Sequence, residues 1–173
     1  MSISKDNILL RCIEESDLAQ IHQWRNKESI QPFVREYREL SLTHIKAWYD
    51  DMIMNKRFEF FIIEQNGNPI GVSGLTYIDW VNKHADLHLG LYERPWADPA
   101  VGNIVVDMMT KYGFDTLNLN KLYAEIYSND RNKLNLFTEY GYSLDAVLRD
   151  HYFHNGQYID SHILSLLRHE YGD

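Results

Sequence analysis

Seven segments of the chain have the hydrophobic pattern of β-strands, either alternating apolar and polar residues or a short apolar run. They are residues 7–13, 58–65, 70–79, 86–93, 121–128, 143–154 and 157–167. Turn-forming residues at 66–69 (NGNP) and at Asn155-Gly156 separate neighbouring segments, as they do in hairpins. We therefore expect the second, third and fourth strands to form an antiparallel meander, and the last two strands to form a hairpin.

Four other segments place apolar residues three and four positions apart, which is typical of helices that bury one face. They are residues 17–24, 41–55 and 131–140, and a helix that begins at Pro99 or Ala100 and continues to Tyr112. Ser41 can cap the second of these helices, and Gly141 can end the last. The polar stretch with interleaved aromatic residues at 31–40 is expected to be a loop.

The order of these elements predicts a mixed α/β fold of the α+β kind. The strand at 86–93, the helix that follows it and the strand at 121–128 form a crossover connection, which sets the two strands parallel. The chain has 173 residues, and no repeat, linker or low-complexity stretch divides it. A single domain over residues 1–173 is therefore expected.

Charge and composition argue against several classes of protein. The formal net charge of −8 does not suit a general nucleic-acid-binding protein, which needs a basic face. The only cysteine, Cys12, cannot form an internal disulfide. The first residues lack the apolar core of a signal sequence, and no apolar run has membrane-spanning length. We therefore expect a cytoplasmic protein with no membrane or nucleic-acid partner.

Histidine and aspartate gather around the final hairpin, at His151, His154, Asp160 and His162. A turn and the alternation of strand residues separate their side chains from one another, whereas a metal ion needs them to converge. No metal site is expected.

The start of the third helix is the first candidate for binding chemistry. Asp98 can cap this helix, and Pro99 suits its first position. The next backbone N–H groups would then point out of the helix end and form a site for an anion such as a pyrophosphate. These groups belong to Ala100, Val101, Gly102 and Asn103. An ordinary capped helix without a ligand has the same pattern, and this alternative stays open.

The chain contains four phrases in this order: GLYERP, AVGNIVVDMMTKYGF, LYAEIYSND and LFTEYGY. In these phrases and their order it resembles the GNAT superfamily of N-acetyltransferases. Three more carry a narrower similarity: WRN at 24–26, PIGVSGLTYID at 69–79 and GLY at 90–92. They are similar to the branch that acetylates the 4-amino group of a nucleotide-linked deoxysugar in pseudaminic acid biosynthesis. The resemblance covers nearly the whole chain.

This resemblance implies a GNAT fold and a substrate pair. The fold has a central mixed, mostly antiparallel sheet of about seven strands, flanked by four helices and splayed between the fourth and fifth strands. The substrates are acetyl-coenzyme A (acetyl-CoA) and a primary amine, here a nucleotide-linked 4-amino-4,6-dideoxy sugar. Aminoglycosides and the N-termini of ribosomal proteins are alternative acceptors. A non-catalytic binding domain on the same fold and a homodimer are also left open.

The resemblance also implies a set of coenzyme-binding residues. Strand-edge backbone groups of Leu91 and Tyr92 would contact the pantetheine arm and the thioester. The pyrophosphate would be bound by amides from Ala100, Val101, Gly102, Asn103 and Ile104, and the pantetheine arm by Asn129 and Asn132. The chain departs from the family's R/Q-x-x-G-x-G/A loop, because only Gly102 matches it and alanines stand at 97 and 100.

A general base must remove a proton from the amine before it attacks the thioester. Glu125 shares one face of its strand with Tyr123 and Tyr127, where it would be partly shielded from water. In the resembled sugar acetyltransferases, a glutamate at the matching place activates a water. A structural glutamate on a polar sheet face is the alternative. His88 is a second candidate base, since an imidazole titrates near neutral pH.

The leaving thiolate lacks its usual proton donor. In the resembled family this donor is a tyrosine early on the last helix, and the matching residue here is Phe137. Tyr140 is the nearest other hydroxyl on that helix. Either Tyr140 serves as the acid, or the thiolate leaves unprotonated.

Four residues are candidates for contact with the acceptor. The resemblance implies that the segment after Trp24 shapes the acceptor pocket, which points to Trp24 and Arg25. Ser73 and Tyr77 on the neighbouring strand can orient the substrate. A uridine-linked donor would also need a basic and aromatic surface, which Arg25, Arg35, Arg38 and the aromatic residues of 33–37 can supply.

Overall fold

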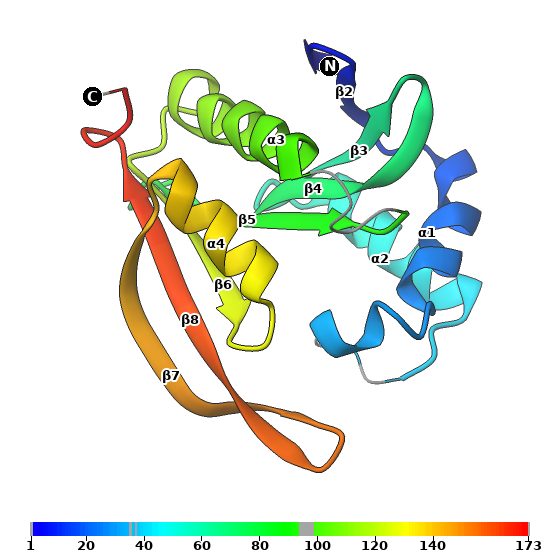
Figure 1. The fold of residues 1–173 in the computed structure, drawn as a ribbon. Helices are drawn as coiled ribbons and strands as arrows, with labels where there is room; N and C mark the ends of the chain where they lie inside the picture. Colours follow the sequence, from blue (N-terminus) through cyan, green and yellow to red (C-terminus); the bar gives the residue numbers. More distant parts are fainter. Residues whose placement is uncertain (1, 35, 37, 94–98, 173) are drawn as a thin grey trace.

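One eight-stranded sheet organises the computed structural model, which describes residues 2–34, 36, 38–93 and 99–172 (Figure 1). The strands are β1 (Ser2–Lys5), β2 (Ile8–Cys12), β3 (Glu59–Gln65), β4 (Asn68–Asp79), β5 (His84–Leu91), β6 (Lys121–Tyr127), β7 (Ser143–His154) and β8 (Gln157–Leu167). Their order is β1-β2-β3-β4-β5-β6-β8-β7. β5 and β6 run parallel, and the other neighbours run antiparallel.

The expected mixed sheet is confirmed, with one more strand than the seven predicted. β1 was missed because its four residues, SISK, have no marked apolar alternation. It is held by its pairing with β2, across a turn in which Asp6 has a φ of 53°.

Within the described residues, four α-helices cover the two faces of the sheet. They are α1 (Leu18–Arg25), α2 (Leu42–Met54), α3 (Pro99–Lys111) and α4 (Arg131–Tyr140). In Figure 1, α3 and α4 lie on one face, and α1 and α2 lie on the other. Three short helical turns, η1 (Glu15–Asp17), η2 (Gln31–Phe33) and η3 (Tyr112–Thr116), join these elements. η2 lies in the segment predicted as loop, and η3 is a π-helical turn that ends α3 just before the predicted limit at Tyr112.

The central strands supply two separate cores, which explains their continuous apolar runs. Phe61 and Ile63 of β3 pack in the core beneath α3 and α4. Ile62 points the other way and packs with Trp24 of α1 and Ile45 of α2. Because both faces of β3 are buried, its sequence shows little of the apolar–polar alternation found in strands with one exposed face.

The predicted split in the sheet lies between β5 and β6. These strands pair only at His84↔Lys121, Ala85↔Leu122 and Asp86↔Tyr123. Beyond this point β5 continues along β4, whereas β6 continues along β8. The strands therefore diverge and leave an open strand edge.

The final hairpin, β7–β8, extends beyond the rest of the sheet (Figure 1). Its predicted turn is confirmed, since Asn155 and Gly156 have φ values of 48° and 80°, as a type I′ turn requires. Two irregularities in the pairing interrupt β7, between Leu144 and Ala146 and between Leu148 and Tyr152. The second of them lies beside the candidate site.

Candidate active site

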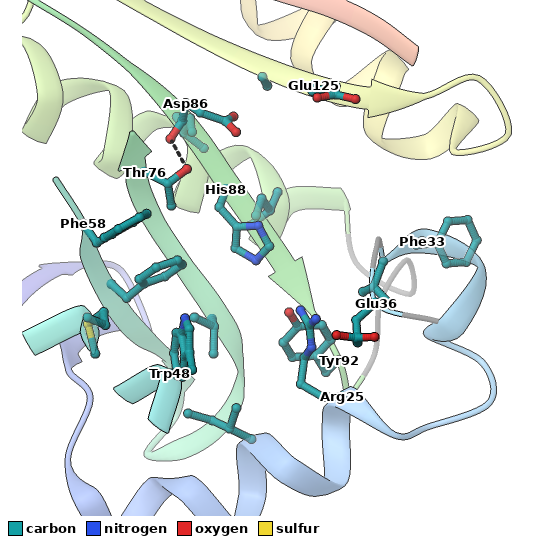
Figure 2. A pocket seen from close by; sticks show the side chains of 18 of the residues that line it. Arg25, Phe33, Glu36, Trp48, Phe58, Thr76, Asp86, His88, Tyr92 and Glu125 are labelled. Atoms are coloured by element: carbon teal, nitrogen blue, oxygen red, sulfur yellow. Dashed lines mark hydrogen bonds between the residues drawn. The ribbon is translucent and has the colours of Figure 1, made fainter. Parts of the chain in front are cut away.

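A pocket of about 610 Å³ opens where β5 and β6 separate (Figure 2). Its walls come from α1, the η2 segment and α2 on one side, and from β3 to β6 and the start of α4 on the other. The residues that meet here are far apart in the sequence. The split in the sheet therefore creates the room in which a thin ligand and a second substrate can meet.

Glu125 lies in this pocket because of the alternation along β6. Leu122, Ala124 and Ile126 point into the core beneath α3 and α4. Glu125 points to the opposite face, and its side chain is 13% exposed. Its Oε1 is 3.6 Å from Nε2 of His151 on β7. The predicted base is therefore in a shielded position that still reaches the pocket.

His88 and Asp86 share one face of β5 and also line the pocket (Figure 2). The ring of His88 packs edge-on against Phe60, with ring centroids 5.8 Å apart. Asp86 stands where the pairing with β6 ends, opposite Tyr123. Glu125, Asp86 and His88 thus line the same pocket from the two diverging strands.

The peptide groups of β5 face in two directions. The N–H of Tyr92 donates to the Ile70 carbonyl of β4 at 2.8 Å, and its carbonyl accepts from Lys27 Nζ at 3.3 Å. The backbone contact expected of Tyr92 is therefore directed away from the open edge. Because alternate residues present their peptide groups to opposite edges, Leu91 and also Leu89 face the gap left by β6. Leu89 was not predicted.

The side chain of Tyr92 forms part of the pocket wall beside Arg25 (Figure 2). Burial raises the pKa of the Tyr92 phenol, although the neighbouring Arg25 acts to lower it. The ring closes over Gly90, where an added Cβ would lie 2.4 Å from the Tyr92 hydroxyl oxygen. Gly90 therefore makes room for this wall.

The start of α3 is described from Pro99 onward, so Arg94, Ala97 and Asp98 of the preceding loop lie outside the described residues. Ala100 is exposed, Asn103 and Ile104 are half-buried, and Val101 and Gly102 are buried. Gly102 faces α4, where an added Cβ would lie 2.9 Å from Cδ2 of Leu136. The glycine thus has a packing role in addition to any role of its amide.

The last helix does not bring a hydroxyl to the pocket. Phe137 is fully buried and packs edge-on against Tyr142. The hydroxyl of Tyr140 donates to Asp107 Oδ1 at 3.0 Å, and Asp107 also pairs with Lys5 at 2.8 Å. Burial and this hydrogen bond raise the pKa of Tyr140. Tyr140 lies at the end of α4 opposite the pocket, so its predicted role as the acid is not supported by its position.

The beginning of α4 contributes to the pocket residues other than the two asparagines predicted to bind the pantetheine arm. Asn129 and Asn132 are exposed and do not line the pocket. The residue that caps the helix is Asp130, which is 4% exposed and accepts the N–H of Lys133 at 3.1 Å. Asp130 and Lys133 both line the pocket, and their side chains form an ion pair at 3.6 Å.

Two of the four predicted acceptor residues line the pocket, namely Arg25 and Tyr77. Trp24 is fully buried, and its indole N–H donates to the carboxylate of Glu93. Ser73 is also fully buried, and its hydroxyl donates to the His88 carbonyl at 2.7 Å. Both residues support the pocket wall from behind and do not form its surface.

Residues 31–40, here called the η2 segment, bring the predicted Arg38 to the pocket, and this segment and α2 also add Glu36, Trp48 and Asp51, which the sequence did not indicate. The guanidinium of Arg38 donates two hydrogen bonds to Glu36, at 2.9 and 2.8 Å, and its backbone N–H donates a third at 3.0 Å; together they lower the pKa of Glu36 to about 2. Trp48 and Asp51 face the pocket from α2. Arg35 and Tyr37, which were expected to contribute here, lie outside the described residues.

The described lining of the pocket carries more acids than bases. Its five carboxylates are Glu36, Asp51, Asp86, Glu125 and Asp130, and its three cations are Arg25, Arg38 and Lys133. Arg38 is paired with Glu36, and Lys133 with Asp130. The charge that remains favours a positively charged ligand.

Within the part of the chain that the structure describes, no three His, Cys, Asp or Glu side chains converge as metal ligands. The helices in this same part are too short or too polar to cross a membrane.

The model of the acetyltransferase (GNAT) domain family matches residues 10–163. The chain belongs to the GNAT acetyltransferase family. It is an acetyl-CoA-dependent N-acetyltransferase, and the alternative of a non-catalytic binding domain is not retained. The open edge of β5 and the first turn of α3 suit this coenzyme, because they offer backbone amides to an extended arm and to a pyrophosphate.

Two curated relatives are similar to this GNAT protein over most of its length. Spermidine N(1)-acetyltransferase of Escherichia coli K12 is 24% identical over 168 residues, which are 97% of this chain and 90% of that protein. Acetyltransferase PseH of Campylobacter jejuni 81-176 is 26% identical over 144 residues, which are 81% of this chain and 85% of that protein.

A solved relative has the same fold. The spermidine N-acetyltransferase of Vibrio cholerae, in complex with CoA and spermine, superposes with a TM-score of 0.90 at 23% identity. The superposition covers 98% of this chain and 100% of that one. At this identity the likeness shows the fold alone.

Proposed function

We propose that this GNAT protein acetylates a primary amine of a small, multiply charged cation of the polyamine class. The observation that carries the proposal is the surplus of carboxylates in the pocket, with Asp51, Asp86 and Glu125 set against Arg25. Aromatic side chains such as Trp48 and Phe58 stand beside them and suit the methylene segments and ammonium groups of a polyamine. The spermidine acetyltransferase relative supports the same acceptor class.

The acceptor nitrogen arrives protonated at neutral pH and must lose a proton before it can attack. In this proposal Asp86 and Glu125 attract the ammonium group to the divergence of β5 and β6. Glu125 then takes the proton, directly or through one water, and the neutral amine attacks the thioester carbonyl. His88 lies on the neighbouring wall and is the alternative base.

Acetyl-CoA supplies the activated acetyl group. The chain holds this coenzyme with the peptide groups of Leu89 and Leu91 along the open edge of β5, and with the first amides of α3. Since Phe137 cannot donate a proton and Tyr140 lies at the far end of α4, the thiolate leaves without a tyrosine acid. The thiolate is stable enough to leave without an acid, and solvent protonates it afterwards because the ordinary pKa of a thiol, about 8.5, lies above neutral pH.

A second candidate acceptor is a nucleotide-linked 4-amino-4,6-dideoxy sugar. Arg25 favours it, since this cation stands in the pocket beside Tyr92 and can bind a phosphate. Phe33 on η2 offers an aromatic face for a base. The PseH relative, at 26% identity, and the phrases shared with the sugar branch support this reading.

A single acceptor screen tests the proposal and separates the two candidates. Coenzyme A release from acetyl-CoA is measured with spermidine, spermine, a diamine, an aminoglycoside, a peptide amine and a nucleotide-linked 4-amino sugar. Turnover with the polyamines and little with the other amines is expected. Turnover only with the nucleotide sugar would replace the first candidate by the second. Turnover with none of these amines would overturn both.

A matched pair of variants connects the result to the pocket. Asp51→Asn should raise the KM for a polyamine and leave the KM for acetyl-CoA unchanged, because it removes one carboxylate from the acceptor side. Asp50→Asn, on the same helix but outside the pocket lining, is the control. Equal effects of the two substitutions would contradict a specific contact at Asp51.

A further inference from the structure

A histidine on the final hairpin lies against the predicted base. Nε2 of His151 is 3.6 Å from Oε1 of Glu125, although β8 separates their strands in the sheet. The side chain of His151 is 49% exposed, whereas that of Glu125 is 13% exposed. The distance slightly exceeds that of a hydrogen bond, so a small rotation of the imidazole or one water joins the two groups.

The irregular pairing of β7 brings His151 to this face. Tyr127 of β6 is opposite Ser161 of β8, and Tyr152 of β7 is opposite Ile159. Opposed residues share a face, and Tyr152 accordingly stacks on Tyr127 with centroids 4.5 Å apart. Strict alternation would turn the preceding residue, His151, to the other face of the sheet. The bulge between Leu148 and Tyr152 removes this restriction.

A second backbone feature holds the bulge in place. Asp150 has a φ of 49°, a left-handed conformation that aspartate tolerates better than most residues. Its N–H donates to Oδ1 of Asp160 on β8 at 2.8 Å. An unfavourable backbone conformation persists only where its surroundings support it, and such conformations cluster at functional sites. The two aspartates therefore place the imidazole of the next residue.

We propose that His151 is a positioning residue that carries the acceptor's proton from Glu125 to solvent. The inference rests on the proposed role of Glu125. The ammonium group of the acceptor gives a proton to the Glu125 carboxylate, and the amine nitrogen keeps its electron pair for the attack. The resulting carboxylic acid passes the proton to the neutral imidazole of His151. The imidazolium releases it to water, and Glu125 is again a carboxylate.

The exposures of the two side chains give the relay its direction. Glu125 is shielded within the pocket, where a bound acceptor covers it further, so it cannot easily exchange a proton with bulk water. His151 is half exposed and borders the solvent.

Other titratable groups surround the pair and contribute to any pH profile. They are Asp86 and His88 on β5, Tyr123 and Tyr127 on β6, Asp130 and Lys133 on α4, Asp150 and Tyr152 on β7, and Asp160 on β8. A comparison of variants is therefore required to separate the contribution of His151 from theirs.

The test compares His151→Asn with His154→Asn, a control from the end of the same hairpin. In His151→Asn we expect kcat to fall by about tenfold or more, toward the 10²-fold at the lower end of general acid–base effects. The KM for acetyl-CoA should not change. The pH profiles of kcat are compared for wild type and His151→Asn, and the relay predicts that the two profiles differ in shape, which they should not between wild type and His154→Asn. Circular dichroism and thermal unfolding of each variant establish that the hairpin still folds.

Three further variants make the result decisive. Added imidazole should restore part of the kcat of His151→Ala but none of that of Glu125→Gln, because only the first retains the carboxylate. His151→Asn combined with Glu125→Gln should be no slower than Glu125→Gln alone. If His151→Asn has the same kcat and the same pH profile as the wild type, the relay is overturned, but the role of Glu125 is not. Unchanged kcat in Glu125→Gln would overturn the role of Glu125 and the relay together.

Discussion

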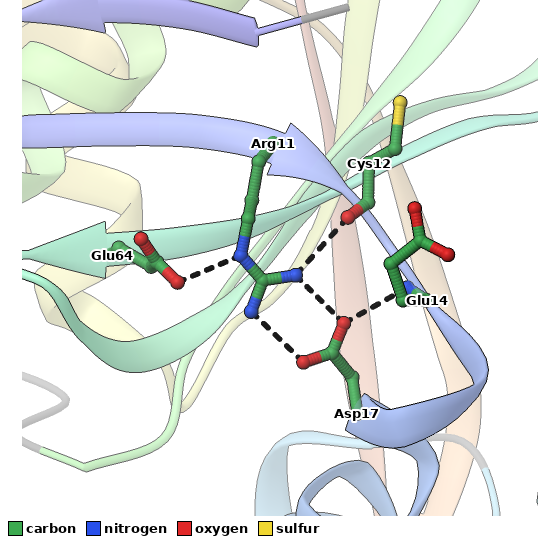
Figure 3. Close-up of polar contacts among 5 residues, drawn as sticks. All are labelled: Arg11, Cys12, Glu14, Asp17 and Glu64. Carbon is green, nitrogen blue, oxygen red and sulfur yellow. Dashed lines mark hydrogen bonds and ion pairs between the residues drawn. The ribbon is translucent and has the colours of Figure 1, made fainter.

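Arg11 on β2 holds Asp17 through two parallel hydrogen bonds, from Nη1 at 2.7 Å and from Nη2 at 2.9 Å (Figure 3). Nε of the same guanidinium donates to Glu64 on β3 at 2.7 Å. One arginine therefore joins two strands to the turn that starts α1. This turn determines where α1 begins, and α1 carries Arg25 into the pocket.

We expect Arg11→Met to destabilise the protein by about 2 kcal/mol, because charge-assisted hydrogen bonds contribute about 1.5–3 kcal/mol and two carboxylates lose their cation. The side chains of Arg11, Asp17 and Glu64 are 28%, 12% and 15% exposed, so water replaces the lost bonds poorly. Chemical denaturation measures the change. Lys46→Ala is the control, since its pair with Glu15 is exposed and should not contribute measurably. Equal losses in the two variants would contradict the prediction.

The same contact predicts a loss of stability in acid. Burial acts to raise the pKa of Asp17, but hydrogen bonds from Arg11 and from the N–H of Glu14 outweigh it and lower the pKa below its ordinary 3.8. A lowered pKa stabilises the fold above the ordinary value, and this stabilisation is lost as pH falls through the folded-state pKa. The difference in unfolding free energy between wild type and Asp17→Asn should therefore shrink from about pH 5 to about pH 2. A difference independent of pH would show that the charge of Asp17 does not matter.

Glu125→Gln should lower kcat by about 10²- to 10⁴-fold and flatten its pH dependence, as expected for loss of a general base. His88→Gln should have a smaller effect, because His88 is the alternative base and packs against Phe60. Steady-state rates over a pH series measure both variants. If Glu125→Gln keeps wild-type rates while His88→Gln loses them, the base is His88.

Ala100→Asp should weaken the binding of coenzyme A without destabilising the protein. A carboxylate in the first turn of a helix interacts favourably with the helix dipole, but it repels a pyrophosphate at the same end. Only about 1.4 kcal/mol of repulsion is needed for a tenfold rise in Kd. Titration calorimetry compares this variant with Ala100→Asn, which has the same size and no charge. Similar Kd values for the two variants would show that the pyrophosphate does not bind at the start of α3.

Two glycines at close contacts should respond differently to alanine. In Gly71→Ala the new Cβ would lie 2.1 Å from the backbone oxygen of Gly90, so β4 and β5 must separate. In Gly102→Ala it would lie 2.9 Å from a methyl carbon of Leu136, whose side chain can rotate. We expect a loss of about 3 kcal/mol in the first variant from overpacking. In the second, higher helix propensity should offset the contact to within about 1 kcal/mol.

Thermal unfolding of the two alanine variants, scanned at one rate and protein concentration, tests the difference. The result also bears on the site, because Gly71 lies opposite Leu91 at the open end of β5. If Gly71→Ala unfolds at the same temperature as Gly102→Ala, then β4 and β5 can separate at this point without loss of stability.

Part of the candidate site was predictable because it depends on local periodicity. Alternation along β6 places Glu125 opposite the core face of Ala124, and alternation along β5 places Asp86 with His88. Periodicity gives the direction of a side chain but not what lies above it. It could not show that Trp24 is covered completely, or that Tyr140 binds Asp107 at the far end of α4.

Other parts of the site come from segments that no local pattern connects. Asp51 and Glu36 join the pocket only because α2 and the η2 segment fold over the sheet. His151 lies beside Glu125 only because a bulge in β7 interrupts the alternation of side chains. A prediction from strict alternation would place His151 on the other face of the sheet.

The sequence by itself determined seven of the eight strands, the four helices and the parallel crossover, because these follow from hydrogen-bonding geometry and from the period of the apolar residues. The split between β5 and β6 was expected only from the resemblance to the GNAT family. Only the tertiary structure decided which polar groups share the pocket and which are used elsewhere. The physical reason is that burial, charge pairing and backbone irregularities depend on contacts between distant segments. Such contacts form when the layers pack, and the order of residues along one strand or helix does not contain them.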